Sequence, residues 1–208
     1  MDVDYVGHPL LDEINKNNDL EKKENHIALI PGSRKQEISK MLPTMLQVAS
    51  HFNSKKFVIA AAPSISESFY KSFHLPKNVT IKKGETYKIM SGAYAALVTS
   101  GTATLETALF KAPEVVCYKG SALSVAIAKR LIKVKYISLV NLIMDKEIVK
   151  ELIQESFTKE NCISELEKLL NPSTKKALLT HYDELAKKLG NSGASKRASD
   201  IIIDLAEN

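Results

Sequence analysis

Short apolar runs separated by helical patterns are the feature that most restricts what this chain can fold into. Six runs are expected to be strands, at residues 26–30, 57–61, 79–81, 95–99, 115–118 and 136–139. Helical patterns lie between them, at residues 43–52, 65–73, 86–92, 102–110 and 121–133. A strand that is apolar throughout is buried on both faces, and strands that alternate with helices form parallel sheets with helices on both sides. The sequence therefore predicts an α/β fold built on a parallel sheet.

Pro43 interrupts a segment whose pattern is otherwise helical. Proline lacks the backbone N–H and clashes with the preceding turn, so it is disfavoured inside a helix and favoured in a first turn. We therefore expect a short turn over residues 34–41 and a helix that begins near Pro43 and ends near Phe52.

The two ends of the chain differ from this alternating middle. Residues 5–7 are expected to form a short strand, and a polar linker follows from Lys16 to Asn25. From Lys146 onward the pattern is helical, at residues 148–154, 163–170, 173–189 and 195–206. We expect three parts, which are a crossing segment and linker over residues 1–25, a sheet domain over 26–171, and C-terminal helices over 172–208.

The last helix carries an apolar group, Ile201, Ile202, Ile203 and Leu205, that needs a surface to pack on. We expect the C-terminal helices to pack on the sheet domain or to reach to a partner. With no such partner in the chain, the sequence predicts either a homodimer or a mobile tail.

The charge of the chain favours anionic ligands. Lys and Arg number 29 and Asp and Glu number 24, which gives a net charge of +5. This excess suits phosphate ligands or anionic lipid, but it is too small and too dispersed to indicate a nucleic-acid partner. The 2 Cys and 5 His form no metal-ligand spacing, so we expect no metal and no cofactor. Reduced thiols fit a cytosolic setting, and no run of about 18 apolar residues is present to span a bilayer.

A turn and a helix start follow the fourth expected strand, in the sequence Ser100-Gly101-Thr102-Ala103-Thr104-Leu105-Glu106. Gly101 allows the turn, and the N–H groups and dipole of a helix start favour an anion. Glu106 lies about one turn further in, where a carboxylate accepts hydrogen bonds from sugar hydroxyls, as in dinucleotide folds. The segment therefore predicts a site for phosphate and sugar together. The alternative for Glu106 is an ordinary capping carboxylate.

Gly32-Ser33-Arg34 follow the first expected strand. The guanidinium fork of Arg34 suits a diphosphate, and a cation there stabilises the charge that grows on a departing phosphate. The alternative is a surface arginine paired with Glu37. Because ligands bind beyond the carboxyl ends of the strands in such a sheet, we expect residues 32–34, residues 100–102 and Asn141 to converge on one edge.

Six motifs in order carry a resemblance to a known family, at residues 6–12, 29–38, 100–106, 128–133, 136–143 and 149–154. Together they resemble the C-terminal half of lipid-A-disaccharide synthases, over nearly the whole chain. That family is similar to other GT-B glycosyltransferases, in which two Rossmann-like domains face a cleft and the C-terminal domain holds the nucleotide-sugar. The resemblance implies a Rossmann-like, doubly wound parallel sheet, the C-terminal domain of a GT-B fold, followed by C-terminal helices.

The resemblance also implies a reaction. Diacylglucosamine passes with inversion from UDP-2,3-diacylglucosamine to 2,3-diacylglucosamine 1-phosphate, which forms the β-1,6 disaccharide of lipid A at the cytoplasmic face of the inner membrane. We expect a peripheral membrane protein whose acceptor-binding domain and general base lie outside this chain, so that the chain alone is inactive. Two alternatives stay open. These are the donor half of another GT-B enzyme, such as a UDP-GlcNAc 2-epimerase, and a non-catalytic nucleotide-binding module.

By the resemblance, Arg34 and Asn141 stabilise the leaving group. The expected donor-binding residues are Gly32, Ser33, Arg34, Ser100, Gly101, Thr102, Glu106, Asn141, Glu151 and Gln154. Glu151 and Gln154 are three residues apart, so we expect them on one face of a helix that looks into the donor pocket. The alternatives are an Asx-turn role for Asn141 and a solvated face for the other two.

Lys129, Arg130 and Lys133 lie in an expected helix that mixes apolar and basic residues. The plainer interpretation is a core helix with a basic solvent edge. The alternative is contact with the inner-membrane surface or with the acyl chains of the donor, because basic amphipathic surfaces bind anionic interfaces.

Overall fold

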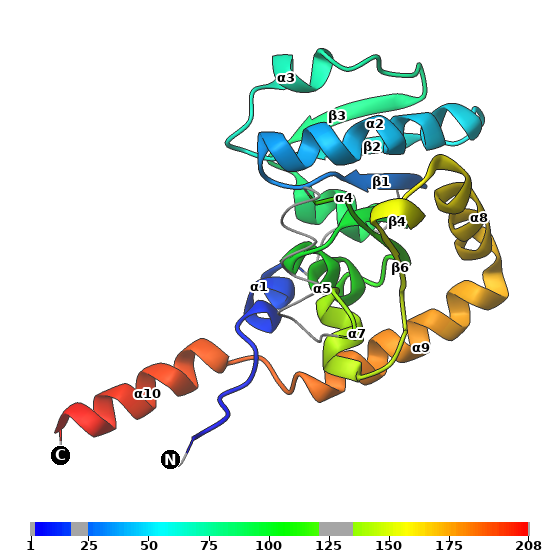
Figure 1. Ribbon diagram of the computed structural model, residues 1–208. Helices are drawn as coiled ribbons and strands as arrows, with labels where there is room; N and C mark the ends of the chain where they lie inside the picture. Colours follow the sequence, from blue (N-terminus) through cyan, green and yellow to red (C-terminus); the bar gives the residue numbers. More distant parts are fainter. Residues whose placement is uncertain (1–2, 18–24, 121–134, 208) are drawn as a thin grey trace.

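A single parallel sheet organises the chain (Figure 1). The computed structural model describes residues 3–17, 25–120 and 135–207. The strands are β1 (His26–Ile30), β2 (Phe57–Ala61), β3 (Val79–Lys83), β4 (Ala93–Thr99), β5 (Glu114–Tyr118) and β6 (Lys150–Ile153). They lie in the order β3-β2-β1-β4-β5-β6, and every neighbouring pair is parallel.

The strand order reverses once, between β1 and β4. The chain runs outward from β1 through β2 to β3, returns to place β4 against β1, and then runs outward the other way to β6. Ile27 pairs with Ala95 and Ile30 with Val98, so the two central strands end at nearly the same level. This junction is the topological switch point, the place where open α/β sheets bind ligands.

Helices cover both faces of the sheet. The described helices are α1 (Leu10–Lys16), α2 (Lys35–His51), α3 (Glu67–Lys71), α4 (Thr86–Gly92), α5 (Thr102–Leu109), α7 (Leu139–Met144), α8 (Lys159–Leu170), α9 (Pro172–Lys188) and α10 (Ala194–Glu207), with a 3₁₀ turn η1 (Gln154–Ser156). Right-handed crossovers that run in opposite directions from the switch point place α2 and α5 on opposite faces. α2 packs against α8, while α5 packs against α4 and α7. The expected Rossmann-like, doubly wound α/β fold is confirmed.

The central strands explain why the sheet was predictable. Every residue of β1 and β2 is buried, and β4 is buried at all positions except Tyr94. Continuous apolar runs are what a strand covered on both faces requires. The core therefore lies along the middle of the sheet, directly beneath the switch point.

Helix α2 differs from the expectation. It runs unbroken from Lys35 to His51 with Pro43 inside it, so the predicted turn over 34–41 and the predicted start at Pro43 are wrong. Ile38 and Leu42 are buried before the proline and Met45 after it. Each buried side chain contributes about 1.5–3 kcal/mol, so one helix that buries all of them outweighs the ~3 kcal/mol cost of the proline.

Two segments near the β6 edge of the sheet differ from the expectation, one forming a helix start in place of a strand and the other a strand in place of a helix. Residues 136–139, expected as a strand, instead lead into α7, where the Ser138 side chain accepts a hydrogen bond from the Asn141 N–H at the helix start. Residues 148–154, expected as a helix, contain β6. Val149, Leu152 and Ile153 are spaced three and four apart, which fits a helix, but pairing with β5 decides for a strand.

Residues 5–7 form no strand, contrary to the expectation. The Tyr5 hydroxyl donates to the Leu189 carbonyl at 2.9 Å, and Arg197 Nε donates to the Val6 carbonyl at 2.9 Å. The carboxylate of Asp12 accepts from the Gly193 N–H and from the N–H and hydroxyl of Ser195. The N-terminal segment is therefore tied to the joint between α9 and α10.

Helix α10 points away from the sheet, beside the N-terminal segment (Figure 1). Ile202 is 66% exposed and Leu205 is 75% exposed. No described helix is both long enough and apolar enough to cross a membrane. The helix expected over 121–133 lies outside the described residues.

Candidate functional site

The candidate site is the rim formed by two loops at the carboxyl edge of the sheet. One loop, Gly32–Arg34, follows β1 and leads into α2, and the other, Ser100–Gly101, follows β4 and leads into α5. Since β1 and β4 are paired neighbours, the two loops flank the switch point. Two of the three segments predicted to converge are therefore brought together, and the name rim is used below for residues 32–34 and 100–102.

The loop after β1 is shaped by Glu37. Gly32 has φ 111°, and a Cβ there would lie 2.7 Å from Glu37 Oε2, so only glycine fits. The same carboxylate oxygen accepts from the backbone N–H of Ser33 at 3.1 Å and of Arg34 at 3.3 Å. Glu37 thus satisfies N–H groups at the start of α2 and fixes the path of the loop.

The side chain of Arg34 is 81% exposed, with Nη1 3.2 Å from Glu37 Oε1. This is the surface pair considered as the alternative from the sequence. An exposed pair of this kind is worth about 0–1 kcal/mol, and the guanidinium has further N–H donors. Arg34 is therefore able to turn to an anion at the rim at little cost.

The turn after β4 opens α5. Gly101 has φ 150°, a backbone region that favours glycine, and open space surrounds its missing side chain. The Gly101 carbonyl accepts from the N–H of Thr104 at 3.1 Å and from its hydroxyl at 2.8 Å. The N–H of Ser100 donates to the Cys117 carbonyl at 3.0 Å, which ties the turn to β5. The first N–H groups of α5 thus open at the exposed residues Gly101 and Thr102, a setting that attracts anions.

Glu106 is held by a residue that the sequence did not reveal. The Tyr87 hydroxyl, on α4, donates to Glu106 Oε1 at 3.0 Å. Burial and the neighbouring Glu106 carboxylate raise the pKa of Tyr87 to about 12, so the phenol keeps its proton and acts as the donor. A carboxylate accepts several hydrogen bonds, so this contact orients Glu106 and leaves acceptor capacity for ligand hydroxyls.

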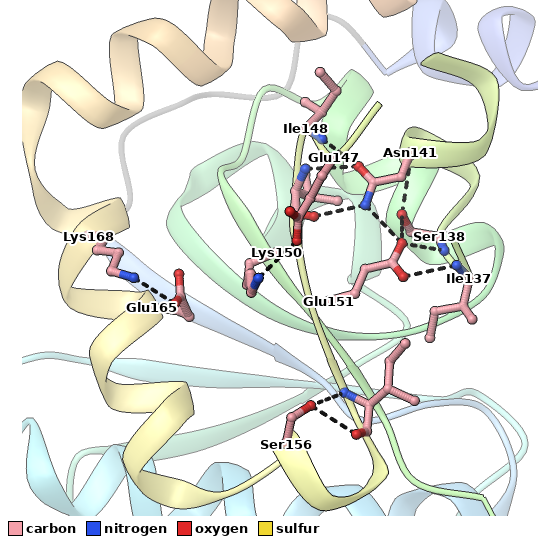
Figure 2. Close-up of polar contacts among 12 residues, drawn as sticks. Ile137, Ser138, Asn141, Glu147, Ile148, Lys150, Glu151, Ser156, Glu165 and Lys168 are labelled. Atoms are coloured by element: carbon pink, nitrogen blue, oxygen red, sulfur yellow. Dashed lines mark hydrogen bonds and ion pairs between the residues drawn. The ribbon is translucent and has the colours of Figure 1, made fainter. Parts of the chain in front are cut away.

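Asn141 lies inside α7 rather than after a strand, and it is fully buried. Figure 2 shows its amide turned into the protein. Nδ2 donates to the Val149 carbonyl and to Glu151 Oε1, both at 2.9 Å, while Oδ1 accepts from the N–H of Ile148 at 2.7 Å and of Val149 at 3.0 Å. These four bonds use both donors and both lone pairs of the amide. The expected direct contact between Asn141 and a leaving phosphate is not compatible with this arrangement.

Glu151 and Gln154 do not share a helix face. Glu151 lies in β6, and its carboxylate faces the segment before α7 (Figure 2). Gln154 follows the carboxyl end of β6 with φ 55°, a strained conformation for a residue with a side chain. Its Nε2 is buried and has no hydrogen-bond partner among the described residues. Of this pair, only Gln154 lies at the carboxyl edge.

Comparison with known proteins decides the family. The profile of the lipid-A-disaccharide synthetases matches residues 1–203. The chain belongs to this family. It is 37% identical to the lipid-A-disaccharide synthase of Syntrophus aciditrophicus over 99% of its own length and 58% of that protein. It is 34% identical to that of Persephonella marina, over 98% of its own length and 59% of the relative. The chain thus spans about three-fifths of the length of the curated relatives it matches.

Solved structures of low sequence identity share the fold of this chain. The calicheamicin glycosyltransferase CalG4 is 13% identical with a TM-score of 0.58, over 89% of this chain and 43% of that one. The UDP-GlcNAc 2-epimerase of Methanocaldococcus jannaschii, solved with UDP-GlcNAc and UDP, is 15% identical with a TM-score of 0.58, over 96% of this chain and 54% of that one. These likenesses confirm the Rossmann-like domain of the GT-B fold.

Some predicted features of the chain fall beyond what the structure describes. Lys129, Arg130 and Lys133 lie outside the described residues, so their contact with membrane or acyl chains stays a prediction. Residues 3–17, 25–120 and 135–207 contain no group of three or more His, Cys, Asp or Glu side chains placed to hold a metal ion. Metal-independent binding also stays a prediction.

Proposed function

We propose that the rim binds the UDP-2,3-diacylglucosamine donor of a lipid-A-disaccharide synthase. The observation that carries the proposal is the meeting of residues 32–34 and 100–102 on either side of the switch point between β1 and β4. Ligands of open α/β sheets bind at this point, and family membership supports a glycosyltransferase donor there. The M. jannaschii epimerase of similar fold was solved with UDP-GlcNAc and UDP, which is consistent with a uridine diphosphate sugar.

Each part of the donor has a matching group at the rim. The pyrophosphate meets the N–H groups that open α5 and the Arg34 guanidinium, and the ribose hydroxyls donate to Glu106 in the orientation that Tyr87 fixes. We propose that the buried Nε2 of Gln154 donates a hydrogen bond to an oxygen of the UDP-sugar, because a buried amide without a partner is costly unless a ligand satisfies it.

The proposed chemistry is inverting transfer with UDP as the leaving group. As the glycosidic bond breaks, negative charge grows on the β-phosphate, and the Arg34 cation and α5 dipole stabilise that charge more than the ground state. Asn141 contributes to the shape of the site, not to the phosphate contacts. We place the acceptor site and the general base in the part of the longer relatives that this chain does not span. Turnover is therefore not expected from these 208 residues alone.

Three further proposals concern the membrane, the division of the chain and its self-association, and the first follows from the lipid nature of both proposed substrates. We propose a cytoplasmic protein at the surface of the inner membrane, contacted through Lys129, Arg130 and Lys133. We propose the division of the chain into a crossing segment (1–25), a UDP-sugar domain (26–171) and C-terminal helices (172–208). The exposed apolar residues of α10 support self-association as a homodimer.

Ligand-observed NMR and titration calorimetry with UDP, UDP-GlcNAc and CMP test the proposal on this chain. We expect UDP and UDP-GlcNAc to bind in competition with each other and CMP to bind at least about tenfold more weakly, a difference of ~1.4 kcal/mol. Equal binding of CMP, or no binding of UDP, would contradict it. Conversion of UDP-GlcNAc to its 2-epimer would point instead to the epimerase alternative.

A further inference from the structure

The carboxylate of Glu151 gathers four hydrogen bonds from one short segment. Oε2 accepts from the Ile137 N–H at 3.0 Å. Oε1 accepts from the Ser138 N–H at 2.9 Å, from the Ser138 hydroxyl at 2.7 Å and from Asn141 Nδ2 at 2.9 Å. Figure 2 shows these groups turned toward one another from β6 and from the start of α7. These four bonds turn the carboxylate toward residues 137–141.

The anchored segment touches the rim directly. The Ser100 hydroxyl donates to the Ile137 carbonyl at 3.0 Å, and the Ile137 N–H donates to Glu151. Ile137 is therefore bonded to the rim through its carbonyl and to Glu151 through its N–H. Ser100 is the residue before Gly101, where the turn into α5 begins. A continuous set of contacts therefore runs from β6 through residues 137–138 to the turn that presents the α5 N–H groups.

A second set of bonds locks the same segment from the other side. The Ser138 hydroxyl accepts from the Asn141 N–H at 3.2 Å while it donates to Glu151. The Asn141 amide in turn holds the backbone of Ile148 and Val149, just before β6. The end of the loop that leads into β6 is therefore bonded to α7 through Asn141.

We propose that Glu151 is a positioning residue, which sets the Ser100–Thr102 turn for the phosphate groups of a nucleotide without touching the nucleotide. The proposal rests on the proposed donor-binding function of the rim. Preorganised N–H groups bind an anion more tightly than groups that must first be ordered. The role needs a carboxylate, because four donors converge on its two oxygens, and an amide in its place would turn an NH₂ group against at least one of them.

Glu151→Gln in this chain tests the proposal, with Glu147→Gln as the matched control. Glu147 lies in the loop between α7 and β6, and its carboxylate pairs with Lys150 Nζ at the exposed surface, at 3.0 Å. UDP affinity is measured by calorimetry below the unfolding transition of every variant. We expect Glu151→Gln to weaken UDP binding about tenfold and Glu147→Gln to leave it within about twofold.

Amide hydrogen exchange without ligand separates positioning from general destabilisation. We expect exchange to become faster at residues 100–104 in Glu151→Gln while residues 32–34, on the far side of the switch point, keep the parent rates. Acceleration at both loops would overturn the proposal, as would parental UDP affinity with unchanged exchange at 100–104. If Glu151→Gln does not fold, Ser138→Ala removes the hydroxyl contact with the carboxylate, and the same comparison decides.

The two readouts also distinguish this proposal from the donor-binding function itself. A parent chain that does not bind UDP contradicts the proposed function, while the exchange rates at 100–104 still test the anchoring by Glu151. A parent chain that binds UDP, together with a Glu151→Gln variant identical to it in both readouts, overturns only the positioning role.

Discussion

The hydroxyl of Tyr87 on α4 donates to Oε1 of Glu106 on α5 at 3.0 Å, across the interface between these two helices. Burial and the Glu106 charge raise the pKa of Tyr87 to about 12, so this donor persists at all physiological pH values. The orientation of the proposed ribose acceptor therefore depends on a residue from a different βα unit.

Tyr87→Phe is expected to weaken UDP binding about three- to tenfold, a loss of ~0.7–1.4 kcal/mol, because Glu106 is no longer held toward the ligand. Calorimetry with UDP and with inorganic pyrophosphate measures the effect, and pyrophosphate affinity should not change. Tyr94→Phe is the control, since its hydroxyl bonds to the Leu170 carbonyl at 3.4 Å and it belongs to the start of β4. Equal losses in the two variants would remove the role of Tyr87.

Arg34→Ala is expected to weaken UDP binding by about tenfold or more and to leave uridine binding unchanged, because the guanidinium acts on the pyrophosphate. Arg34→Lys should recover only part of the loss, since a lysine keeps the charge without the fork. Lys35→Ala removes a charge from the next residue and serves as the control. An Arg34→Ala variant with the parental affinity would leave Arg34 as a surface partner of Glu37.

Removal of divalent metal is expected to have no effect on UDP binding. Arg34 and the start of α5 supply the positive charge that a metal supplies in other nucleotide sites. Titrations of UDP in EDTA and in excess Mg²⁺ should give affinities within about twofold of each other. A clear loss of affinity in EDTA would show that the pyrophosphate binds together with a metal ion.

The buried carboxyl of Glu114 is expected to make the free energy of unfolding depend on pH. Both its carboxyl oxygens are buried without a hydrogen-bond partner among the described residues, and burial raises its pKa well above the ordinary value of 4.5. Below pH 4.5 the Glu114 carboxyl is protonated in both the folded and the unfolded protein, so its burial does not make stability depend on pH. Above pH 4.5 the unfolded chain releases the proton while the folded protein keeps it. The free energy of unfolding therefore falls by about 1.4 kcal/mol per pH unit until the folded carboxyl ionises.

Glu114→Gln should remove this penalty. We expect the variant to gain stability over the parent as the pH rises from about 5 to about 8, measured by urea unfolding with circular dichroism. Glu167→Gln, at an exposed position of α8, should follow the parent at every pH. A Glu114→Gln curve parallel to that of the parent would show that the carboxyl is ionised in the folded protein.

The exposed apolar side chains of helix α10 lead us to expect self-association of the chain. With Ile202 66% and Leu205 75% exposed, light scattering should show a mass above the 23.0 kDa of one chain. Ile202→Lys with Leu205→Lys should return the protein to a monomer, while Lys196→Gln on the polar side of the helix should not. A parent protein that scatters with the 23.0 kDa mass of one chain would contradict this expectation.

The central sheet could be predicted because burial on both faces leaves a continuous apolar signal, as in β1, β2 and β4. At the edge that signal fades. β6 has Leu152 buried but Lys150 exposed, and its apolar spacing fits a helix equally well. At Pro43 the sequence signal is strong but the prediction from it is wrong. The local preference of proline against a helix interior is outweighed by the burial of the long apolar face of α2.

The candidate site was predictable only in part, for a related reason. Strand ends and glycines mark the rim loops, so residues 32–34 and 100–102 could be found from the sequence. Tyr87 could not, because its meeting with Glu106 depends on how α4 packs on α5. The resemblance draws attention to Asn141 and Glu151, but residue identity does not give side-chain orientation, and these two side chains face each other.

The pairing of β1 with β4 has a consequence for how the molecule matures. The two halves of the rim follow strands that are separated in the chain by the whole β2–β3 unit, so β4 must leave the ribosome before the proposed nucleotide site can form. A truncated nascent chain has the Arg34 loop and nothing opposite to it. Uridine nucleotides, if they bind as proposed, should therefore recognise only chains in which β4 has paired with β1, and their binding energy adds to the stability of that pairing.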